Sequence, residues 1–398
     1  RLELIIRTSV FILIMFLARH QSKRLLTGAR LSLNNYSRAF SQSDTEIPIV
    51  DMTPFMEDPT SEASKVEVKK VAEAFHKFGV VVIKDPRVDE QHNDEFVDML
   101  EKYFEVSDGK RDARPEHHYQ VGVTPSNTEV PRNHSETMAK LADSEKPLTA
   151  VEPEADPKWR FFWRIGSKPE KTKYPSLNAD PVIPEEFPEW SETMDMWGTK
   201  MLSALHTLAG MTAVGFNLPP NSIQDLMNCG PHLLAPTGSD FNTYNKVNTV
   251  LAGYHYDLNF MTIHGKSRYP GLYVWLRDGR RVPVKVPTGH LIVQAGKQFE
   301  YLTGGHVLAG FHEVVISDAT VQTIETRKNE GKSLWRVSST LFGHIASDNT
   351  LEPLGHFATE ESKQEYPSMD AGQQVEAELN AIKLDFGSTE SPNKKAKN

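Results

Sequence analysis

The sequence has only one cysteine, Cys229, in 398 residues, so no internal disulfide can form. Structural zinc sites that use several cysteine ligands are excluded for the same reason. A chain without disulfides is typical of a reducing compartment. The flanking residues Asn228, Gly230 and Pro231 form no recognisable catalytic context, so we interpret the thiol as buried or merely tolerated rather than as a nucleophile.

Long apolar runs and an excess of basic residues are missing as well. No stretch of 18 or more consecutive apolar residues occurs, so we expect no stable membrane span in the mature protein. The net charge of -9 and the pI near 5.9 do not indicate the excess of positive charge that binding to nucleic acid requires. Hydrophobic residues make up 38% of the chain, which is enough to bury a core. We therefore expect a soluble, globular monomer.

The first 45 residues differ in composition from the rest and resemble a targeting segment. Residues 10–17 are apolar, and residues 15–43 contain basic residues but no Asp or Glu. One interpretation takes Met15 as the true start and residues 38–41 as a mitochondrial processing site. The alternative is a signal sequence over residues 1–18 followed by a plastid transit peptide. The mitochondrion is favoured over the plastid because charged and polar residues interrupt the apolar stretch, and a cytoplasmic location is expected if the leader is an artefact.

The pattern of apolar residues after position 46 predicts helices and strands in a definite order. The β-branched segment 47–51 predicts a strand. Apolar residues at three- and four-residue spacing from Val68 to Phe75 predict a helix that Gly79 ends, followed by a buried strand at 80–83. A second helix is expected from about 188 to 215. Residues 105–157 are charged and weakly periodic, which indicates a long excursion over the core.

From residue 240 to 344 the pattern changes to short β-type runs separated by glycine. Strands are expected at 272–276, 282–286, 290–294, 314–316 and 336–341. Closely spaced strands with turn signals indicate an antiparallel barrel or jelly roll, with the earlier helices packed outside it. The expected fold class is therefore α+β with a mainly β core. The tail from 385 to 398 is predicted to be disordered.

The motif His255-Tyr256-Asp257 is the most informative feature of this half. Side chains two apart on a strand face the same side, so His255 and Asp257 can aim at one point while Tyr256 faces away. His312, 55 residues later, could join them from another strand. Two imidazoles and one carboxylate leave half of an octahedral Fe(II) open, which an oxygen-activating enzyme needs. Alone, His-x-Asp is weak evidence in a chain with 15 histidines.

Several blocks around this motif resemble the isopenicillin N synthase-like family of Fe(II)-dependent, mostly 2-oxoglutarate-dependent oxygenases. In the second half these blocks are Gly253–Ile263, Gly271–Trp275, Val286–Gly296, Tyr301–Gly305, His312 and Arg336–Phe342. In the first half they are Ile47–Asp51, the helix before Phe78-Gly79, Lys158-Trp159 and Tyr174-Pro175. The resemblance covers roughly residues 46 to 357, and it is specific because independent blocks occur in the right order.

The resemblance implies a double-stranded β-helix, or jelly roll, with a helical N-terminal module. It divides the chain into a targeting segment at 1–45, the N-terminal module at 46–235, the core that binds Fe(II) and 2-oxoglutarate at 236–357, and a C-terminal extension at 358–398. The end of this extension coincides with the tail predicted to be disordered.

The same resemblance assigns roles to individual residues. His255, Asp257 and His312 would ligate the iron. Arg336 and Ser338 would hold the distal carboxylate of 2-oxoglutarate, since a guanidinium offers permanently charged, fork-like donors and the hydroxyl two residues on lies on the same face of the strand. Tyr244 is a weaker candidate for a place near the cosubstrate.

Two features depart from the family pattern. Glu313 follows His312 where plant members usually have Arg, and we expect it to lie outside the coordination sphere. The gap of 24 residues from His312 to Arg336 is long for the family and implies an extended hairpin over residues 318–333. The remaining histidines of this half are interpreted as structural, with His306 the most credible rival to His312 and the others being His264, His290 and His344.

The expected activity is that of an Fe(II)- and 2-oxoglutarate-dependent dioxygenase that oxidises a C–H bond of a small molecule. Hydroxylation, desaturation and ring closure all remain open, with O2 consumed and succinate and CO2 as coproducts. Alternatives are an iron oxidase of the same fold that does not use 2-oxoglutarate, and a catalytically silent scaffold. A zinc hydrolase could also use this ligand set, but the His-Glu-x-x-His helix of such enzymes is missing from the sequence.

The substrate is the least determined part of the interpretation. The aromatic segment 159–164, Lys266, Arg268 and the excursion at 105–157 could help to wall the pocket, although an aromatic cluster is more often core. A small, carboxylated molecule is the preferred substrate class.

Overall fold

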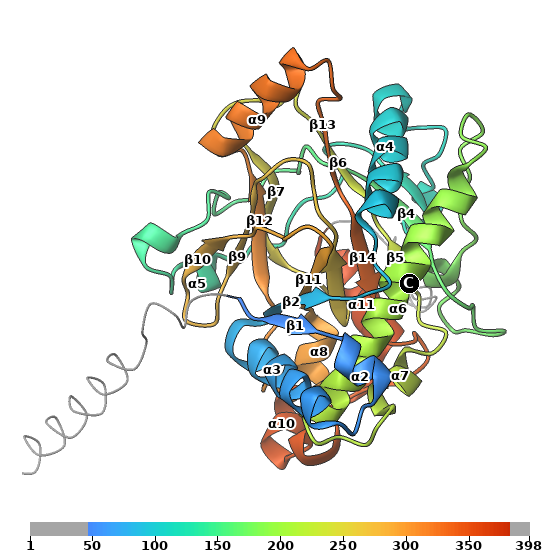
Figure 1. Cartoon of the computed structure of the whole chain (residues 1–398), viewed down its shortest axis with the longest axis vertical. Helices are drawn as coiled ribbons and strands as arrows, with labels where there is room; N and C mark the ends of the chain where they lie inside the picture. The colour runs from blue at the N-terminus through green and yellow to red at the C-terminus, as the bar shows by residue number, and fades with distance from the viewer. Residues whose placement is uncertain (1–46, 383–398) are drawn as a thin grey trace, which may run out of the picture. The chain divides into compact units, whose positions relative to one another are not determined.

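A large β-sheet runs through the computed structural model, which describes residues 47–382 (Figure 1). The expected targeting segment and the tail from residue 385 lie outside the described residues. Within residues 47–382, every helix is too short or too polar to cross a membrane. Helices and large sheets occur together, which confirms the expected α+β class.

The large sheet has ten strands and combines both halves of the sequence. Its order is β1-β2-β11-β8-β14-β5-β4-β6-β13, and β3 pairs with β4. The strands are β1 (Ile49–Asp51), β2 (Val80–Lys84), β3 (Gly122–Thr124), β4 (Trp159–Arg164), β5 (Leu233–Leu234), β6 (Thr237–Asp240), β8 (Met261–His264), β11 (His290–Ala295), β13 (Trp335–Ser338) and β14 (Thr340–Gly343). The strands of this sheet come from both sides of residue 235, the predicted boundary between the N-terminal module and the core. The sheet therefore does not test this boundary, which stays a prediction.

A second sheet of four strands faces the large one across the site described below. Its order is β10-β9-β12-β7, and all its pairings are antiparallel. The strands are β7 (Val250–Tyr256), β9 (Leu272–Trp275), β10 (Arg281–Pro283) and β12 (Phe311–Val315), and a separate pair consists of β15 (Thr350–Leu351) and β16 (Met369–Asp370). The rings of His264 in β8 and His312 in β12 have centroids 6.1 Å apart, so the two sheets meet at the site.

Helices connect and cover these sheets. They are α2 (Thr53–Glu57), α3 (Glu62–Phe78), α4 (Glu90–Val106), α5 (Ser135–Met138), α6 (Trp190–Gly215), α7 (Ser222–Met227), α8 (Lys297–Leu302), α9 (Asp318–Asn329), α10 (Glu360–Glu365) and α11 (Ala371–Ala381). The first expected helix is α3, which begins after the N-cap Ser61 and ends at Gly79 in the left-handed conformation. The expected strand β2 follows directly.

The second expected helix, α6, forms the centre of the hydrophobic core. Its apolar face is fully buried and packs against the outer face of β8 and β14, as Figure 1 shows for the long helix beside the sheet. Gly343 in β14 is required for this packing, since a Cβ atom there would overlap the side chain of Leu205. The inner faces of β8 and β14 are thereby left free for polar side chains.

The segment between His312 and Arg336 is helical, which corrects the expectation of an extended hairpin. Ser317 and Thr320 form a capping box at the start of α9, and Arg327 and Lys328 lie in its last turn. These local signals favour a helix because they satisfy free backbone groups and complement the helix dipole. The weak apolar periodicity of a helix with only two buried side chains explains why the sequence pattern did not reveal it.

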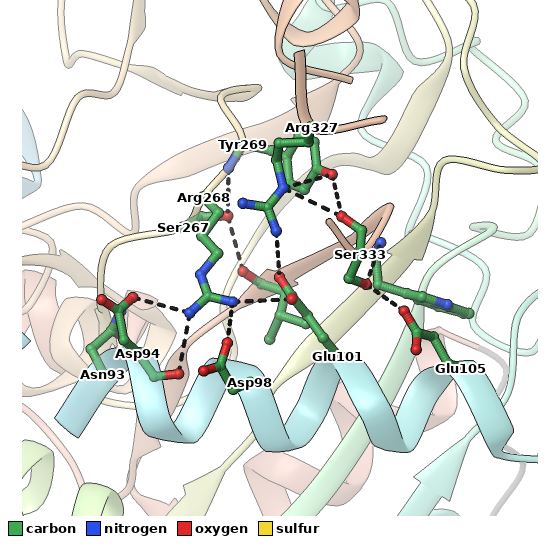
Figure 2. Close-up of polar contacts among 12 residues, drawn as sticks. Asn93, Asp94, Asp98, Glu101, Glu105, Ser267, Arg268, Tyr269, Arg327 and Ser333 are labelled. Atoms are coloured by element: carbon green, nitrogen blue, oxygen red, sulfur yellow. Dashed lines mark hydrogen bonds and ion pairs between the residues drawn. The ribbon is translucent and has the colours of Figure 1, made fainter. Parts of the chain in front are cut away.

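A polar network fastens this insertion to α4, as Figure 2 shows. Glu101 of α4 accepts hydrogen bonds from Arg268 at 3.0 Å and from Arg327 of α9 at 3.4 Å. Arg327 also donates to the hydroxyl of Tyr269, and Ser333 donates to Glu105. Because Ser333 lies two residues before β13, the network holds the start of the strand that carries Arg336.

Candidate active site

His255, Asp257 and His312 converge at one point between the two sheets. His255 is the second-last residue of β7 and lies directly opposite His312 of β12 in the antiparallel ladder. The nearer oxygen of Asp257, Oδ1, lies 3.7 Å from Nε2 of His255 and 3.9 Å from Nε2 of His312. His255 and His312 are 57 positions apart in the sequence, and cross-strand pairing brings them together.

Hydrogen bonds from neighbouring groups orient two of the three side chains. Nδ1 of His255 lies 2.6 Å from the carbonyl oxygen of Gly253, which leaves Nε2 free to bind a metal. The hydroxyl of Thr262 donates to Oδ2 of Asp257 at 2.6 Å, so that Oδ1 faces the two imidazoles. Burial, followed by the proximity of His312, holds the pKa of His255 well below its usual value, which favours the neutral imidazole that metals bind.

The geometry fits a first-row divalent ion. Metal bonds to histidine nitrogen and carboxylate oxygen are about 2.0–2.2 Å long, so two ligand atoms on one ion lie at most about 4.4 Å apart. Both distances from Asp257 fall within this limit. Among residues 47–382, this is the group of side chains that could hold a metal ion. Its two-histidine, one-carboxylate composition is that of a non-haem Fe(II) centre with open positions.

Arg336 lies on the inner face of β13 and is 4% exposed. Its neighbours Trp335 and Val337 point the other way, into the hydrophobic core. Within residues 47–382 its guanidinium forms no ion pair, and its Nε atom has no hydrogen-bond partner. Burial lowers the pKa of Arg336 to about 10, so it stays charged at neutral pH. A buried cation without an anion is costly, and a carboxylate ligand would remove that cost.

Ser338 shares this inner face, two residues along β13. Its hydroxyl lies 3.0 Å from the hydroxyl of Thr340. The structure therefore brings Arg336 and Ser338 to one wall, as the family resemblance implies, and this wall fits a carboxylate anchor.

The N-terminal part of the chain matches a known family, and the fold matches solved enzymes. Residues 47–186 match the family described as non-haem dioxygenase in morphine synthesis N-terminal. A 2OG-Fe(II) oxygenase family protein from Caulobacter crescentus is similar in structure, with a TM-score of 0.65, 22% identity, and coverage of 85% of this chain and 99% of that one. The chain therefore has the fold of solved 2OG-Fe(II) oxygenases, and its N-terminal part matches a non-haem dioxygenase family.

Two further solved structures are similar. A full-length protein from Neurospora crassa in complex with alpha-KG has a TM-score of 0.65 at 18% identity, covering 86% of this chain and 98% of that one. The rice dioxygenase for auxin oxidation has a TM-score of 0.58 at 18% identity, covering 84% and 95%. No curated protein matches the chain in sequence. These comparisons support the family resemblance drawn from the sequence, and the His-Asp-His group supports an iron site.

Tyr244 does not share the inner wall with Arg336. Its ring packs against a separate hydrophobic cluster that includes Phe241, Tyr269 and Ile324 of α9. The residues that line the cavity beside the triad do not include it. The geometry thus gives Tyr244 a packing role, and its assignment to the cosubstrate stays a prediction without structural support.

The other histidines of this half fall into two groups. His290 hydrogen-bonds locally to the carbonyl of Thr288, as expected, and His306 stacks on His76 at a centroid distance of 4.1 Å, remote from the triad. His264 and His344 are buried beside the site, and each has a ring nitrogen without a partner in the described range. The sequence interpretation treated these two as structural and so missed their place in the site.

Glu313 lies outside the coordination sphere, as expected. It is fully buried on the outer side of β12, where its carboxylate accepts hydrogen bonds from the backbone N–H groups of Leu148 and Thr149. Arg281 lies 3.5 Å from the same carboxylate. Glu313 therefore fastens the excursion at 105–157 to the strand that carries His312.

A cavity of about 100 Å³ opens beside His255 and Asp257. The excursion forms much of its wall, and the end of the described chain closes it. Its lining includes Gln120, Glu129, Val130, Arg132, His134, Asp156, Lys158, Arg160, Phe162, Leu233, Phe342, His344, Glu378, Leu379 and Ile382. Of the pocket residues suggested by the aromatic segment, Phe162 lines the cavity, whereas Phe161 and Trp163 belong to the core. Lys266 and Arg268 bind acidic residues of α4 instead.

The buried Lys158, the partly buried Arg160 and two buried carboxylates form the polar side of this cavity. Lys158 pairs with Asp156 and, at 3.0 Å, with Glu129, which also binds Arg160 at 3.2 Å. Asp156 accepts a hydrogen bond from the backbone of Gly253, two residues before His255. The guanidinium of Arg160 lies 5.4 Å from the ring centres of both Phe162 and Phe342. This cluster joins the pocket wall to the metal-binding strand.

Proposed function

We propose that the protein oxidises a C–H bond of a small molecule, with 2-oxoglutarate converted to succinate and CO2. One observation supports this most strongly: Arg336, which is buried and has no ion-pair partner in the described part of the chain, and the His255–Asp257–His312 centre occupy the same interior. A metal centre and a separate carboxylate anchor are what a bidentate keto acid with a distal carboxylate requires.

Each residue has a distinct task in this proposal. His255, Asp257 and His312 would hold Fe(II) on one face and leave the opposite positions open. Bound there, the metal together with the keto acid would activate O2 for the oxidation of an unactivated C–H bond. Thr262 keeps the Asp257 carboxylate turned toward the metal position. Arg336 and Ser338 would fix the far end of 2-oxoglutarate, so that its keto acid end reaches the metal.

The cavity supports a small-molecule substrate. Its size and its mixture of phenyl rings with buried charges suit a compact, partly polar ligand. Solved structures similar to this chain hold small molecules, namely thymine in the Neurospora crassa protein and JA in JOX2. Hydroxylation, desaturation and ring closure depend on how the substrate radical lies relative to the metal, and all three stay within the proposal. The preference for a carboxylated substrate is retained, with Arg160 and Arg132 the arginines that line the cavity.

The proposal also includes the detailed fold of the protein, its cellular location and its oligomeric state. The two facing sheets support a double-stranded β-helix with a helical N-terminal module. On the sequence pattern alone, we propose import into mitochondria rather than plastids, and a monomeric state. The expected results are a mature N-terminus near residue 46 in isolated mitochondria and a monomer mass in light scattering.

The test is release of succinate from 2-oxoglutarate by the purified protein with Fe(II) and O2. Slow release is expected without substrate, and a metabolite screen for compounds that stimulate it would identify the substrate. His255→Ala and Asp257→Ala are expected to abolish release. Oxygen consumption without loss of 2-oxoglutarate would instead indicate the iron oxidase, and release unaffected by both substitutions would contradict the iron assignment.

A further inference from the structure

His264 lies on the inner face of β8, two residues beyond Thr262, which binds the metal ligand Asp257. Its neighbours Ile263 and Met261 belong to the hydrophobic core on the other face. His264 is 8% exposed, and its Nε2 atom has no hydrogen-bond partner among residues 47–382. A buried donor or acceptor left without a partner costs about 1–3 kcal/mol, so such an atom calls for a ligand.

A chain of hydrogen bonds links His264 to the carboxylate anchor. Thr340 of β14 is paired directly with His264 in the sheet, and its hydroxyl lies 3.2 Å from Nδ1 of the ring. The same hydroxyl lies 3.0 Å from that of Ser338. The ring therefore stands between the metal position, with His312 at a centroid distance of 6.1 Å, and the wall formed by Arg336 and Ser338.

We propose that His264 is a third anchor for the distal carboxylate of 2-oxoglutarate, beside Arg336 and Ser338. This inference rests on the proposed function. It gives His264 the place that the sequence interpretation gave to Tyr244, whose ring packs in a separate cluster.

The hydrogen-bonding chemistry of the ring suits this role. Burial lowers the pKa of His264 to about 4, so the ring is neutral at neutral pH and carries one N–H group. When the hydroxyl of Thr340 donates to Nδ1, the proton of the ring lies on Nε2 and is available to a ligand. A carboxylate has about four acceptor positions, of which a guanidinium fork fills two. The Nε2–H group would fill a third, and the Ser338 hydroxyl would fill the fourth once its proton turns from Thr340 toward the ligand.

Binding rather than turnover provides the test. 2-Oxoglutarate is titrated by calorimetry into the Fe(II)-loaded protein without oxygen, for the wild type, His264→Leu and His264→Gln. Leucine removes one hydrogen bond to a charged group, and a loss of about tenfold in affinity is expected. Glutamine can present an N–H group at nearly the same place, and its affinity is expected within about threefold of the wild type, by the same relation between hydrogen-bond energy and affinity.

Binding of a second ligand distinguishes the loss of a specific contact with the distal carboxylate from general damage to the site. 2-Oxopentanoate has the same chain length but lacks the distal carboxylate, so His264→Leu should bind it as the wild type does. Thr340→Val gives an independent perturbation, because it removes the hydroxyl that orients the ring, and it should weaken 2-oxoglutarate binding without affecting 2-oxopentanoate. Tyr244→Phe is the matched control and should leave both affinities unchanged.

Three results would overturn the inference. They are unchanged binding of 2-oxoglutarate by His264→Leu, equal weakening of both keto acids, and weakening by Tyr244→Phe alone. A loss of Fe(II) affinity in His264→Leu would also overturn it, since the ring would then serve the metal. Failure of the wild-type protein itself to bind 2-oxoglutarate would contradict the proposed function, which distinguishes the two failures.

Discussion

The metal side and the substrate side of the active site are built in different ways. The metal side consists of residues on paired strands and of Asp257, which directly follows β7, and their positions follow from alternation and register. His255 and His312 face each other across one ladder, and Thr262 and His264 share one face of β8. The substrate side consists of the excursion at 105–157 and the end of α11, where backbone and side chains meet through non-local ion pairs. Local rules therefore position the candidate metal ligands, whereas non-local packing shapes the cavity that we propose binds the substrate.

The largest expected effect comes from removing a metal ligand. Asp257→Ala should lower the affinity for Fe(II) by at least about 100-fold, because losing a group that merely orients a ligand already costs about 10–100-fold and this change deletes a charged ligand. Phe162→Ala, on the substrate side, is the matched control and should leave the affinity unchanged. Equal losses in both variants would show that the two sides are not independent. Competition against a fluorescent metal chelator measures the affinities.

A smaller effect is expected from the residue that orients this ligand, on the same side. Thr262→Val keeps the shape of the side chain but removes the hydroxyl that donates to Asp257 at 2.6 Å. The affinity for Fe(II) should fall about 10–100-fold, with little change in the melting temperature. An affinity equal to that of the wild type would mean that β8 does not preorganise the metal side, and the same chelator competition would show it.

The pH dependence of stability tests the burial of His344, a residue that lies where the metal side and the substrate side meet. Burial lowers the pKa of His344 to about 3, below the value of about 6.5 in an unfolded chain. The unfolded state therefore takes up a proton first as the pH falls, and stability present above pH 6.5 is lost toward pH 3. Between pH 7 and 4.5 this residue alone should cost about 3 kcal/mol, at about 1.4 kcal/mol per pKa unit.

Urea unfolding of the metal-free protein at several pH values measures this loss. His344→Gln should lose less stability than the wild type over the same pH range, because glutamine does not titrate. Parallel pH profiles for the two proteins would show that His344 is not buried in the neutral form.

The smallest effect concerns the contact that holds α11 over the cavity. Glu378 accepts hydrogen bonds from Arg132 at 3.1 Å and from the hydroxyl of Tyr256 at 3.2 Å. Partly exposed contacts of this kind contribute less than about 1 kcal/mol, so Glu378→Gln should speed proteolytic cleavage of α11 less than about fivefold. The Fe(II) affinity should not change. A loss of metal affinity would link the substrate side to the metal side directly.

The sequence predicted those parts that follow from short-range rules. Alternation along a strand aligned His255 with Asp257, a left-handed glycine ended α3 at Gly79, and the apolar face of α6 gave its place in the core. The inward direction of Arg336 also followed from the alternating residues around it.

The parts that the sequence did not predict depend on contacts between distant residues. The ion cluster of Lys158 with Glu129 and Asp156 has no periodic signal, because its members lie in irregular segments or at the start of a strand. Helix α9 has too few buried side chains to show a pattern. His264 looked like any buried histidine until the sheet register placed it beside Thr340.

The central claim is that one interior holds Fe(II) at the triad and 2-oxoglutarate across the metal and Arg336. The most direct measurement is an anaerobic titration of the Fe(II)-loaded protein with 2-oxoglutarate, followed by the visible charge-transfer absorption that appears only when the keto acid chelates the iron. We expect the absorption to saturate at one 2-oxoglutarate per chain in the wild type and in Phe162→Ala, to require much more ligand in Arg336→Leu, and to be missing in Asp257→Ala. Saturating 2-oxoglutarate without this absorption in the wild type, or full absorption in Asp257→Ala, would contradict the account.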